Sequence, residues 1–450
     1  MAEKNDLMEK IVSLAKRRGF VFQGSEIYGG LAGTWDYGPR GVALKNNIKN
    51  LWWKMFVNGR DDMYGLDAAI LMNEKVWEAS GHTGAGFTDP VVVCKSCNSR
   101  FRADHIGWTE SNNPLAGVTC PECGEEDWAE VKKFNLMFET KVGAEGTTKS
   151  YLRPETAQGI FVNFKNIVDS MNPKLPFGIA QVGKAFRNEI APRDFVFRAR
   201  EFEQMEVEYF VKENEWEKYF EEWRQSIHRY IDVLGIDAKK VHEVEIEEAD
   251  RAHYSKRTID FEFKFPFGQK ELYGLAYRTD FDLKNHTEHA GEKLAYFDEE
   301  TKEHITPHVI EPSLGVERTV MAVLVSAYRE DELGGERRVY LAFKPVLAPV
   351  KACVSPLLKN KPELVAKARE VYDALKKEVP QVVWDDNGNI GKRYRRQDEI
   401  GTPFCITIDF DTLGENPENK DTVTLRHRDT GEQERLTLTE AIKKVVDSQK

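Results

Sequence analysis

Residues 183–210 read GKAFRNEIAPRDFVFRAREFEQMEVEYF. The first part of this stretch alternates as a strand does, so Arg187 and Glu189 share one face, because side chains in a strand repeat every two residues. A loop that contains Pro192 follows. The return strand carries an aromatic ring and polar groups on one face: Phe202, Gln204 and Glu206. Its other face is apolar: Met205, Val207 and Tyr209. The pattern predicts a β-hairpin with one polar face.

That polar face carries the groups that a nucleotide needs. A guanidinium such as that of Arg187 can clamp a phosphate, and the ring of Phe202 can stack on a purine. The alternative is a solvated hairpin with alternating charges. Because a solvated face has no use for an aromatic ring among carboxylates, we favour the nucleotide-binding interpretation.

A second informative stretch, residues 308–330, reads HVIEPSLGVERTVMAVLVSAYRE. It predicts a short strand, a turn at Pro312 and a helix from about Ser313. The apolar spacing of the helix marks its buried side: Val316, Val320 and Val323. Arg318 falls one turn into the helix, near the N-terminus, where the helix dipole favours anions. The alternative for Arg318 is an ordinary exposed helical arginine.

Length and composition narrow the class of protein. The 450 residues allow about three domains, and 41% apolar with 31% charged residues excludes a disordered tail or a collagen-like repeat. The net charge of −11 argues against a protein that coats duplex DNA, although a local patch could still bind RNA. No run reaches the ~18 apolar residues of a membrane span, and residues 1–20 lack a secretory apolar core. We expect a cytoplasmic protein with no membrane or DNA partner.

Six cysteines include two C-x-x-C pairs, Cys94 with Cys97 and Cys120 with Cys123. In a reducing cytosol such pairs are typical of a four-thiolate zinc ribbon, with the ion held tetrahedrally and no open coordination position. We therefore predict a structural Zn²⁺ site, with free buried thiols as the alternative. The other two cysteines, Cys353 and Cys405, stand alone.

The remaining chain shows several elements. Amphipathic helices are predicted in residues 1–18, 44–55 and 214–235, and the run LDAAIL at 66–71 predicts a strand. The glycine-rich residues 24–41 lack the G-x₄-G-K-[ST] pattern of a phosphate loop, so we interpret them as turns and close backbone contacts. Residues 328–338, YREDELGGERR, are interpreted as a linker. Beyond them, strands alternate with helices, which predicts a separate α/β domain of about 110 residues.

Several stretches in order resemble one family. FRNE and FRAREFEQME resemble motif 2 of class II aminoacyl-tRNA synthetases, and EPSLGVER resembles motif 3. Three further stretches are similar to the dimeric glycyl-tRNA synthetases: RPETAQG at 153–159, KELYGLAYRTDFDL at 270–283 and GFVFQGSEIYGGLAGTWDYGP at 19–39. The resemblance covers nearly the whole chain.

The resemblance implies an α+β fold. It implies an antiparallel catalytic sheet with flanking helices in a domain 1–335, in which 91–130 is the zinc-ribbon-like insertion. It also implies an anticodon-binding α/β domain at 338–450. Residues 41–56 with 66–71 could serve as motif 1, which builds the interface of a homodimer.

The implied activity is that of a ligase that joins glycine to tRNA(Gly). Glycine would attack ATP, which comes with Mg²⁺, to form glycyl-adenylate, and the glycyl group would then pass to tRNA. By resemblance Arg187 holds the α-phosphate, Phe202 stacks the adenine, and Arg318 holds the γ-phosphate. The catalytic residues implied are Arg187, Glu189 and Arg318.

The resemblance also implies two sets of contacts. The ATP contacts are Arg187, Asn188, Glu189, Phe197, Arg198, Ala199, Arg200, Glu201, Phe202, Glu271, Leu272, Gly315, Val316, Glu317 and Arg318. The glycine contacts are Arg102, Glu155, Phe202, Glu203, Gln204, Met205, Glu206, Glu311, Pro312, Ser313, Leu314 and Gly315. Among these, acids resembling the family's ammonium pocket stand out, because glycine offers no side chain to bind. For Glu155, the alternative is a charge at the start of a helix.

A basic run at 392–396 surrounds Tyr394 and suits unstacked bases and phosphates of tRNA. Its alternative is a solvated helix face. Two other functions remain open at this point. The first is a class II synthetase for serine, threonine or proline; the second is an accessory RNA-binding protein without catalysis, which would be expected to lack Arg187, Glu189 or Arg318.

Overall fold

A seven-stranded sheet organises the larger part of the chain in this computed structural model, which describes residues 2–84, 87–109, 115, 117–252 and 254–449. Neighbouring strands are antiparallel except for one parallel edge pair. In spatial order the strands are β12 (Val241–Glu245), β13 (Arg257–Phe265), β14 (Gly268–Thr279), β17 (His308–Gly315), β11 (Glu201–Val211), β10 (Phe177–Phe186) and β3 (Met63–Gly65). The α+β fold predicted from the sequence is confirmed, and so is the hairpin of β10 and β11.

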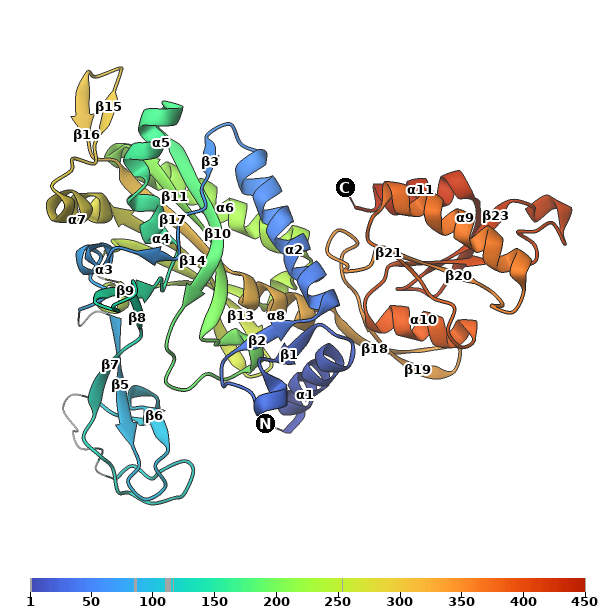
Figure 1. Cartoon of the computed structure of the whole chain (residues 1–450), viewed down its shortest axis with the longest axis horizontal. Coiled ribbons are helices and arrows are strands. Elements are labelled where there is room, and N and C mark those ends of the chain that lie inside the picture. Colours follow the sequence, from blue (N-terminus) through green and yellow to red (C-terminus); the bar gives the residue numbers. More distant parts are fainter. Residues whose placement is uncertain (1, 85–86, 110–114, 116, 253, 450) are drawn as a thin grey trace.

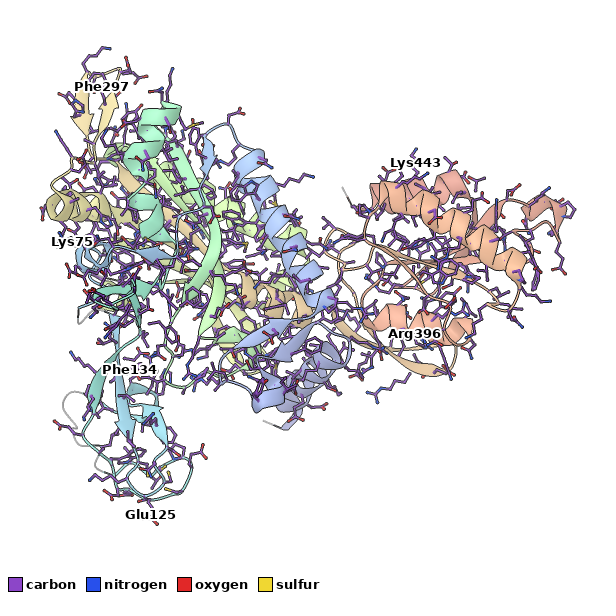
Figure 2. The ribbon with its side chains drawn as sticks, viewed as in Figure 1. Lys75, Glu125, Phe134, Phe297, Arg396 and Lys443 are labelled. Atoms are coloured by element: carbon purple, nitrogen blue, oxygen red, sulfur yellow. The ribbon has the colours of Figure 1, made fainter. Side chains whose placement is uncertain are left out.

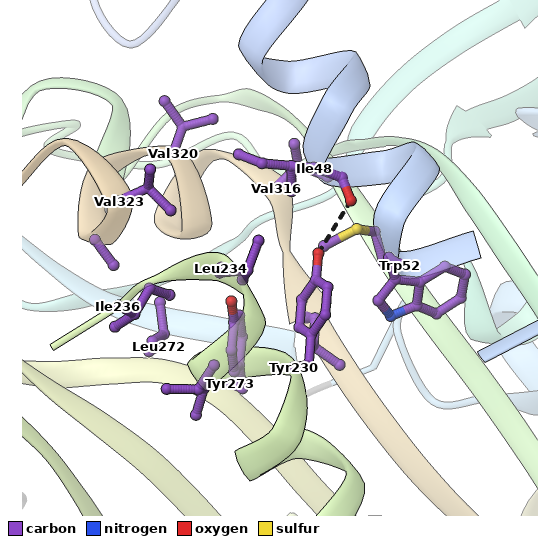
Figure 3. Close-up of a cluster of buried hydrophobic side chains, with 14 of the residues drawn as sticks. Ile48, Trp52, Tyr230, Leu234, Ile236, Leu272, Tyr273, Val316, Val320 and Val323 are labelled. Atoms are coloured by element: carbon purple, nitrogen blue, oxygen red, sulfur yellow. Dashed lines mark hydrogen bonds between the residues drawn. The ribbon is translucent and has the colours of Figure 1, made fainter. Parts of the chain in front are cut away.

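One face of this sheet is covered by helices and forms the main core (Figure 1). The covering helices are α1 (Ala2–Arg17), α2 (Pro39–Trp53), α6 (Trp216–Leu234) and α8 (Val316–Ala327). Figure 3 shows where α2, α6 and α8 meet over the sheet, and there the Tyr230 hydroxyl donates to the Ile48 carbonyl at 3.1 Å. Gly235 closes α6 with φ 71°, a backbone conformation that favours glycine.

The opposite face of the sheet is covered over only one end. There α4 (Ala157–Phe161), α5 (Phe164–Met171) and α7 (Phe281–Ala290) pack on apolar side chains that include Phe210 and Ile179. Further along the same face of β11 the residues become polar, beginning with Glu208 and Glu206. The fold therefore leaves a polar part of the sheet open beside a small apolar core.

A small domain projects from the larger domain, which is built on the seven-stranded sheet (Figure 1). Its sheet consists of β5 (Thr88–Val93), β6 (Arg100–Arg102) and β7 (Lys132–Asn135). Figure 2 shows Glu125 at its far end and Phe134 near its base. Of the predicted insertion 91–130, residues 110–114 and 116 lie outside the described residues. A neighbouring sheet joins the insertion to the body through β4 (Leu71–Met72), β8 (Phe138–Val142) and β9 (Thr148–Leu152).

The C-terminal α/β domain lies to one side of the larger domain (Figure 1). Its strands follow the order β21 (Val382–Trp384), β20 (Ala352–Pro356), β22 (Phe404–Ile408), β23 (Thr422–His427) and β24 (Gln433–Thr437). Its helices are α9 (Pro362–Glu378), α10 (Ile390–Glu399) and α11 (Leu438–Asp447). The apolar stripe of α9 is buried in a core separate from that of the larger domain: Leu364, Ala368, Val371 and Leu375. The shorter elements elsewhere are β1 (Val21–Gln23), β2 (Trp35–Tyr37), α3 (Glu74–Ala79), β15 (Tyr296–Asp298) and β16 (Glu303–Ile305).

Three local predictions are wrong. Residues 66–71 are largely not a strand, because the chain leaves the sheet after β3 and the Ala68 carbonyl accepts from Arg153 instead, at 2.7 Å. The turn predicted at Pro312 and the helix predicted from Ser313 are displaced: Pro312 pairs with Leu275 inside β17, Ser313 still pairs with both neighbouring strands, and the helix begins at Val316. The predicted linker is a hairpin, β18 (Tyr328–Leu333) and β19 (Glu336–Leu341), whose two turn glycines have φ 64° and 79°.

Within the described part of the chain, no helix combines the length and the apolar character needed to cross a bilayer.

Candidate active site

A cavity of about 690 Å³ opens on the uncovered part of the large sheet. Its floor consists mostly of small residues on the two central strands: Gly274, Ala276, Ser313 and Gly315. The ladder aligns Glu206 with Ser313, Ser313 with Gly274, and Gly274 with Asp260, so this row crosses four strands on one face. Small side chains in the middle of the row make the space, and carboxylates stand at both ends.

Arg187 enters the cavity just beyond the end of β10. Its Nε donates to the Pro154 carbonyl at 3.1 Å, and its guanidinium lies 5.5 Å from the ring centroid of Phe202. Among the residues that the structure describes, no carboxylate lies within ion-pair distance of Arg187. An arginine with unused donors beside an aromatic ring can bind a phosphate next to a stacked base.

Arg318 faces the same cavity from the first turn of α8. Its guanidinium stacks on Phe197 at 4.8 Å and pairs with Glu271 at 2.9 Å. This arginine holds the pKa of Glu271 below its usual value. Arg187 and Arg318 therefore line one cavity, as the nucleotide-binding hypothesis required.

A β-bulge directs Glu271 toward the cavity. Strict alternation would put Glu271 on the same face as Tyr273, which is buried in the helix-covered core. The register of β13 and β14 shifts here, so that Phe261 pairs with Tyr273 but Glu262 pairs with Glu271. Leu272 is the extra residue, and it packs into the core with 1% exposure.

Two buried glutamates, Glu155 and Glu206, line the inner end of the cavity. Glu206 accepts from Ser313 Oγ at 2.6 Å, Gln204 Nε2 at 2.7 Å and the backbone N–H of Thr156 at 3.0 Å. Burial, followed by the charge of Glu155, raises the pKa of Glu206. Burial also acts on Glu155, but His82 and Arg278 outweigh it and hold its pKa below the usual range.

Behind these residues, Glu311 accepts from Arg278 at 2.9 Å, and Asp282 accepts from Arg278 Nε and Nη2, both at 2.8 Å. Burial and the neighbouring carboxylates raise the pKa of Glu311 to about 8, although Arg278 opposes the shift. The pocket thus holds several acids around one buried guanidinium. Such an excess of buried negative charge can be balanced by a small cation entering the cavity.

Glu208 extends this acidic cluster beneath the apolar cover. The ladder of β11 with β17 pairs Glu206 with Ser313 and Tyr209 with Ile310, which places Glu208 opposite Glu311. Glu208 is fully buried, and neither of its carboxyl oxygens has a hydrogen-bond partner within the described residues. Burial, followed by the charge of Glu311, raises the pKa of Glu208 well above its usual value, which favours its protonated form.

The cavity brings together most of the predicted site residues: Arg102, Glu155, Arg187, Glu189, Phe197, Arg198, Ala199, Phe202, Gln204, Glu206, Glu271, Leu272, Glu311, Ser313, Gly315, Glu317 and Arg318. Two of these, Arg102 and Glu317, are held by residues that the sequence did not single out. Arg102 pairs with Asp89 at 2.9 Å, and Glu317 accepts from Lys45 at 2.6 Å.

Other predicted contacts do not line the cavity: Asn188, Arg200, Glu201, Glu203, Met205, Pro312, Leu314 and Val316. Strand alternation turns Met205 and Leu314 into the helix-covered core, and Glu203 pairs there with Lys45 at 2.6 Å. Arg200 donates to the backbone carbonyls of Ala32 and Glu189, at 2.7 and 3.0 Å, and so fastens the hairpin loop to the glycine-rich turn. Only some residues of each contiguous motif therefore line the cavity.

Sequence reasoning missed several residues of this region, among them Asp260, Arg278 and His82. Arg278 lies within the quoted stretch 270–283, and its signal was an arginine directly after the mostly apolar run LYGLAY. Asp260 alternates with the apolar Ile259 and Phe261, which could have placed it on the polar face. His82 precedes the insertion and carried no recognisable sequence signal.

The four paired cysteines meet in the projecting domain. Their Sγ atoms all lie within 4.8 Å of one another, with Cys94 to Cys123 at 3.6 Å and Cys97 to Cys120 at 3.7 Å. Four thiolates at about 2.3 Å from a tetrahedral Zn²⁺ would be separated by about 3.8 Å. The sulfur positions are thus compatible with a zinc site of the closed, structural kind.

The basic run in the C-terminal domain is less available than its sequence suggested. Arg393 is buried and donates to the carbonyls of Gly388 and Asp386 at 2.7 and 3.1 Å. Arg396 pairs with Asp385 at 2.7 Å, and Arg395 lies 3.4 Å from Glu336. This helix face is neither a free tRNA patch nor a merely solvated one, because most of its charge holds the domain together.

Comparison with known proteins agrees with this geometry. Residues 138–327 match the tRNA synthetase class II core domain (G, H, P, S and T), and residues 351–448 match the anticodon binding domain. The chain is 51% identical to a glycine–tRNA ligase of Clostridium acetobutylicum over 96% of both chains. It is also 51% identical to one of Geobacillus thermodenitrificans over 98% of both chains. The chain belongs to the glycine–tRNA ligase family. The family assignment confirms the resemblance expected from the quoted motifs.

The fold also extends beyond glycine–tRNA ligases. A prolyl-tRNA synthetase of Giardia lamblia, solved with prolyl-adenylate, superposes with a TM-score of 0.69 at 15% identity. The superposition covers 99% of this chain and 80% of that one. At this level of identity the match concerns the fold alone.

Proposed function

We propose that this enzyme activates glycine with ATP and then transfers the glycyl group to the 3′ end of tRNA(Gly). The observation that carries this proposal is a single cavity in which Arg187, Phe202 and Arg318 face two buried glutamates, Glu155 and Glu206. The two arginines and the phenylalanine suit a nucleoside triphosphate. The two carboxylates suit the ammonium of a very small amino acid.

In the activation step a carboxylate oxygen of glycine attacks the α-phosphorus of ATP, and the bond to pyrophosphate breaks. Arg187 holds the α-phosphate and stabilises the charge that develops there, because its outer nitrogens have no carboxylate partner among the described residues. Phe202 stacks the adenine. Arg318 leaves Glu271 and binds the γ-phosphate instead. Glu189 and Arg198, whose charged groups lie 3.8 Å from each other, border the nucleotide.

Glycine is selected by charge and by size. Glu206 and Glu155 attract the ammonium, and Ser313, which donates to Glu206, fixes the direction of that carboxylate. A pocket built for the smallest amino acid can exclude larger ones sterically, so a separate editing domain is unnecessary. This favours glycine over the serine, threonine and proline alternatives.

Metal ions have candidate positions in the cavity and in the projecting domain. Glu271 is the carboxylate that would hold Mg²⁺ with ATP, where the ion would neutralise phosphate charge, whereas Glu311 is paired with Arg278 behind the amino-acid pocket. The four cysteines would hold a Zn²⁺ that supports the projecting domain, and metal analysis of the purified protein tests this.

We further infer a cytoplasmic homodimer with residues 41–56 and 66–71 at its interface, and a division between a catalytic domain 1–335 and an anticodon-binding domain 338–450. The separate apolar core within residues 352–445 supports two domains, and Leu341, Phe343 and Leu347 still pack in the core of the larger one. Of the basic run, only Lys392 is exposed and unpaired enough to meet a tRNA phosphate.

Amino-acid-dependent exchange of pyrophosphate into ATP tests the proposed function. We expect exchange with glycine, and at least about 100-fold lower kcat/KM with alanine or serine, because a larger side chain must displace the carboxylates. Exchange with serine or proline but not with glycine would contradict the substrate assignment. RNA binding without any exchange would favour the accessory-protein alternative.

A further inference from the structure

Asp260 lines the cavity from β13, on the side opposite Arg187, and the reaction outlined above gives it no task. Its neighbours along the strand, Ile259 and Phe261, are buried in the core, so its side chain lies on the cavity face. Among the residues that the structure describes, no side chain or backbone group donates to its carboxylate or pairs with it. Asp260 therefore faces the substrate space with its hydrogen-bonding capacity unused.

The space beside Asp260 is open because Gly274 has no side chain. Gly274 is the cross-strand partner of both Asp260 and Ser313. A methyl group built on Gly274 would meet no atom within 4 Å. Strands lie about 4.8 Å apart, so a gap of about 10 Å separates the backbones that carry Asp260 and Ser313. A sugar ring has a suitable size for this gap.

The neighbouring groups indicate which part of the substrate would lie there. Phe202 and Arg318 mark the base and outer phosphates, Glu206 and Ser313 mark the amino acid, and Arg187 marks the phosphate between them. The ribose of an adenylate connects base and phosphate. Since Arg187 occupies the β10 side of this junction, the β13 side remains for the sugar, directly over Gly274.

We propose that the Asp260 carboxylate accepts a hydrogen bond from a ribose hydroxyl of ATP, positioned over the open floor at Gly274. This inference rests on the proposed function. Burial, followed by Glu271 and Glu262, raises the pKa of Asp260 to about 7, while Arg318 opposes the shift. A raised pKa is expected for a carboxyl that lacks donors in the unliganded protein, and the ribose hydroxyl would supply one.

The test compares ATP, 2′-deoxy-ATP and 3′-deoxy-ATP in glycine-dependent pyrophosphate exchange by the full-length enzyme. We expect the wild type to use one of the deoxy nucleotides at least about 10-fold less efficiently than ATP. Asp260→Ala should lower kcat/KM for ATP by a similar factor and leave the value for that deoxy nucleotide nearly unchanged, because the interaction is already absent. Glu262→Gln is the matched control, since Glu262 lies two residues along the same strand and is bound by Gln269.

Gly274→Ala gives a second measurement that does not depend on the acid. The backbone there is not left-handed and the position is open, so the variant should fold with an unchanged melting temperature. We expect a higher KM for ATP with an unchanged KM for glycine. An unchanged KM for ATP would contradict a sugar over this residue.

Other outcomes overturn the proposal. An equal loss for ATP and both deoxy nucleotides in Asp260→Ala, or no loss for any, would exclude a ribose contact. Normal exchange with slowed single-turnover transfer to tRNA would assign the carboxylate to the terminal ribose of tRNA instead of ATP. If Asp260→Ala changes the Mg²⁺ requirement but not the ratio of kcat/KM for ATP to that for the deoxy nucleotide, Asp260 is a metal contact instead. If the wild type shows no glycine-dependent exchange, the proposed function itself fails.

Discussion

Arg187 in the catalytic cavity and Arg393 in the C-terminal domain carry the same guanidinium, but their surroundings differ. Within the described residues, the Arg187 side chain donates one hydrogen bond, to the Pro154 carbonyl at 3.1 Å, whereas Arg393 donates to the carbonyls of Pro356, Asp386 and Gly388. Both lie in sequence stretches that suggest RNA or nucleotide binding. The difference teaches that available donors, more than residue type, separate a ligand site from an internal support.

The same contrast applies to acids. Asp398 in the C-terminal domain is completely buried and binds Arg426 through two contacts, at 2.8 and 2.9 Å. Glu208 beneath the catalytic cavity is equally buried, and no group within the described residues hydrogen-bonds to it. Proteins tolerate such unsatisfied groups mainly where a ligand or proton compensates for them.

Replacing Arg187 should remove activity without removing the fold. We expect Arg187→Ala to lower kcat for glycine-dependent exchange by about 10³-fold, because a preorganised donor to the transition state is lost. Its melting temperature should stay within about 2 °C of the wild type, since only one hydrogen bond is broken. Exchange kinetics and calorimetry measure the two effects. Full exchange activity in this variant would refute the role of Arg187.

Replacing Arg393 should have the opposite result. Arg393→Ala leaves several buried carbonyls without donors, so we expect about 3 kcal/mol less free energy of unfolding for the C-terminal domain. Exchange activity per folded active site should remain unchanged. Lys392→Ala is the matched control, because Lys392 is the exposed neighbour and should leave stability unaltered. A large loss of exchange in correctly folded Arg393→Ala would break the comparison.

Removing the charge of Glu206 should affect glycine rather than ATP. We expect Glu206→Gln to raise the KM for glycine by about 10- to 100-fold, since a charge-assisted contact to an ammonium contributes about 1.5–3 kcal/mol. The KM for ATP should stay within twofold. Glu203→Gln provides the control, because Glu203 lies on the same strand but pairs with Lys45 on the other face. Equal effects of both variants on the KM for glycine would count against the assigned pocket.

Glu208→Gln should show a small, pH-dependent gain in stability. Folding raises the pKa of Glu208, so the folded state binds a proton that the unfolded state releases. The stability that this proton contributes is complete below the pKa of Glu208 in the unfolded state, and it declines as the pH rises toward the pKa in the folded state. Glutamine does not titrate. Hence the melting temperature of the variant relative to ligand-free wild type should increase by about 2 °C between pH 5.5 and 8.5. A constant difference would argue that Glu208 is ionised throughout.

Much of the catalytic face could be predicted from alternation in residues 183–210. A period of two places Phe202, Gln204 and Glu206 together in any strand, whatever surrounds it. Position 318 could likewise be placed at the start of a helix. The paired cysteines were equally local signals, because each C-x-x-C turn places two thiols on the same side of the chain, ready to bind one metal ion. The contact sets that took every residue of a motif were less accurate, since every second residue of a strand faces the core.

The tertiary structure alone decided the features that depend on distant partners. The bulge at Leu272 moves Glu271 onto the cavity face, and no local pattern announces it. The alignment of Asp260, Gly274, Ser313 and Glu206 joins four strands through long-range register. Whether Arg393 was free or saturated depended on carbonyls 5 to 37 residues away along the chain. Sequence determines which groups a strand or helix presents on a face, because that periodicity is local; only packing determines which of those groups remain without partners.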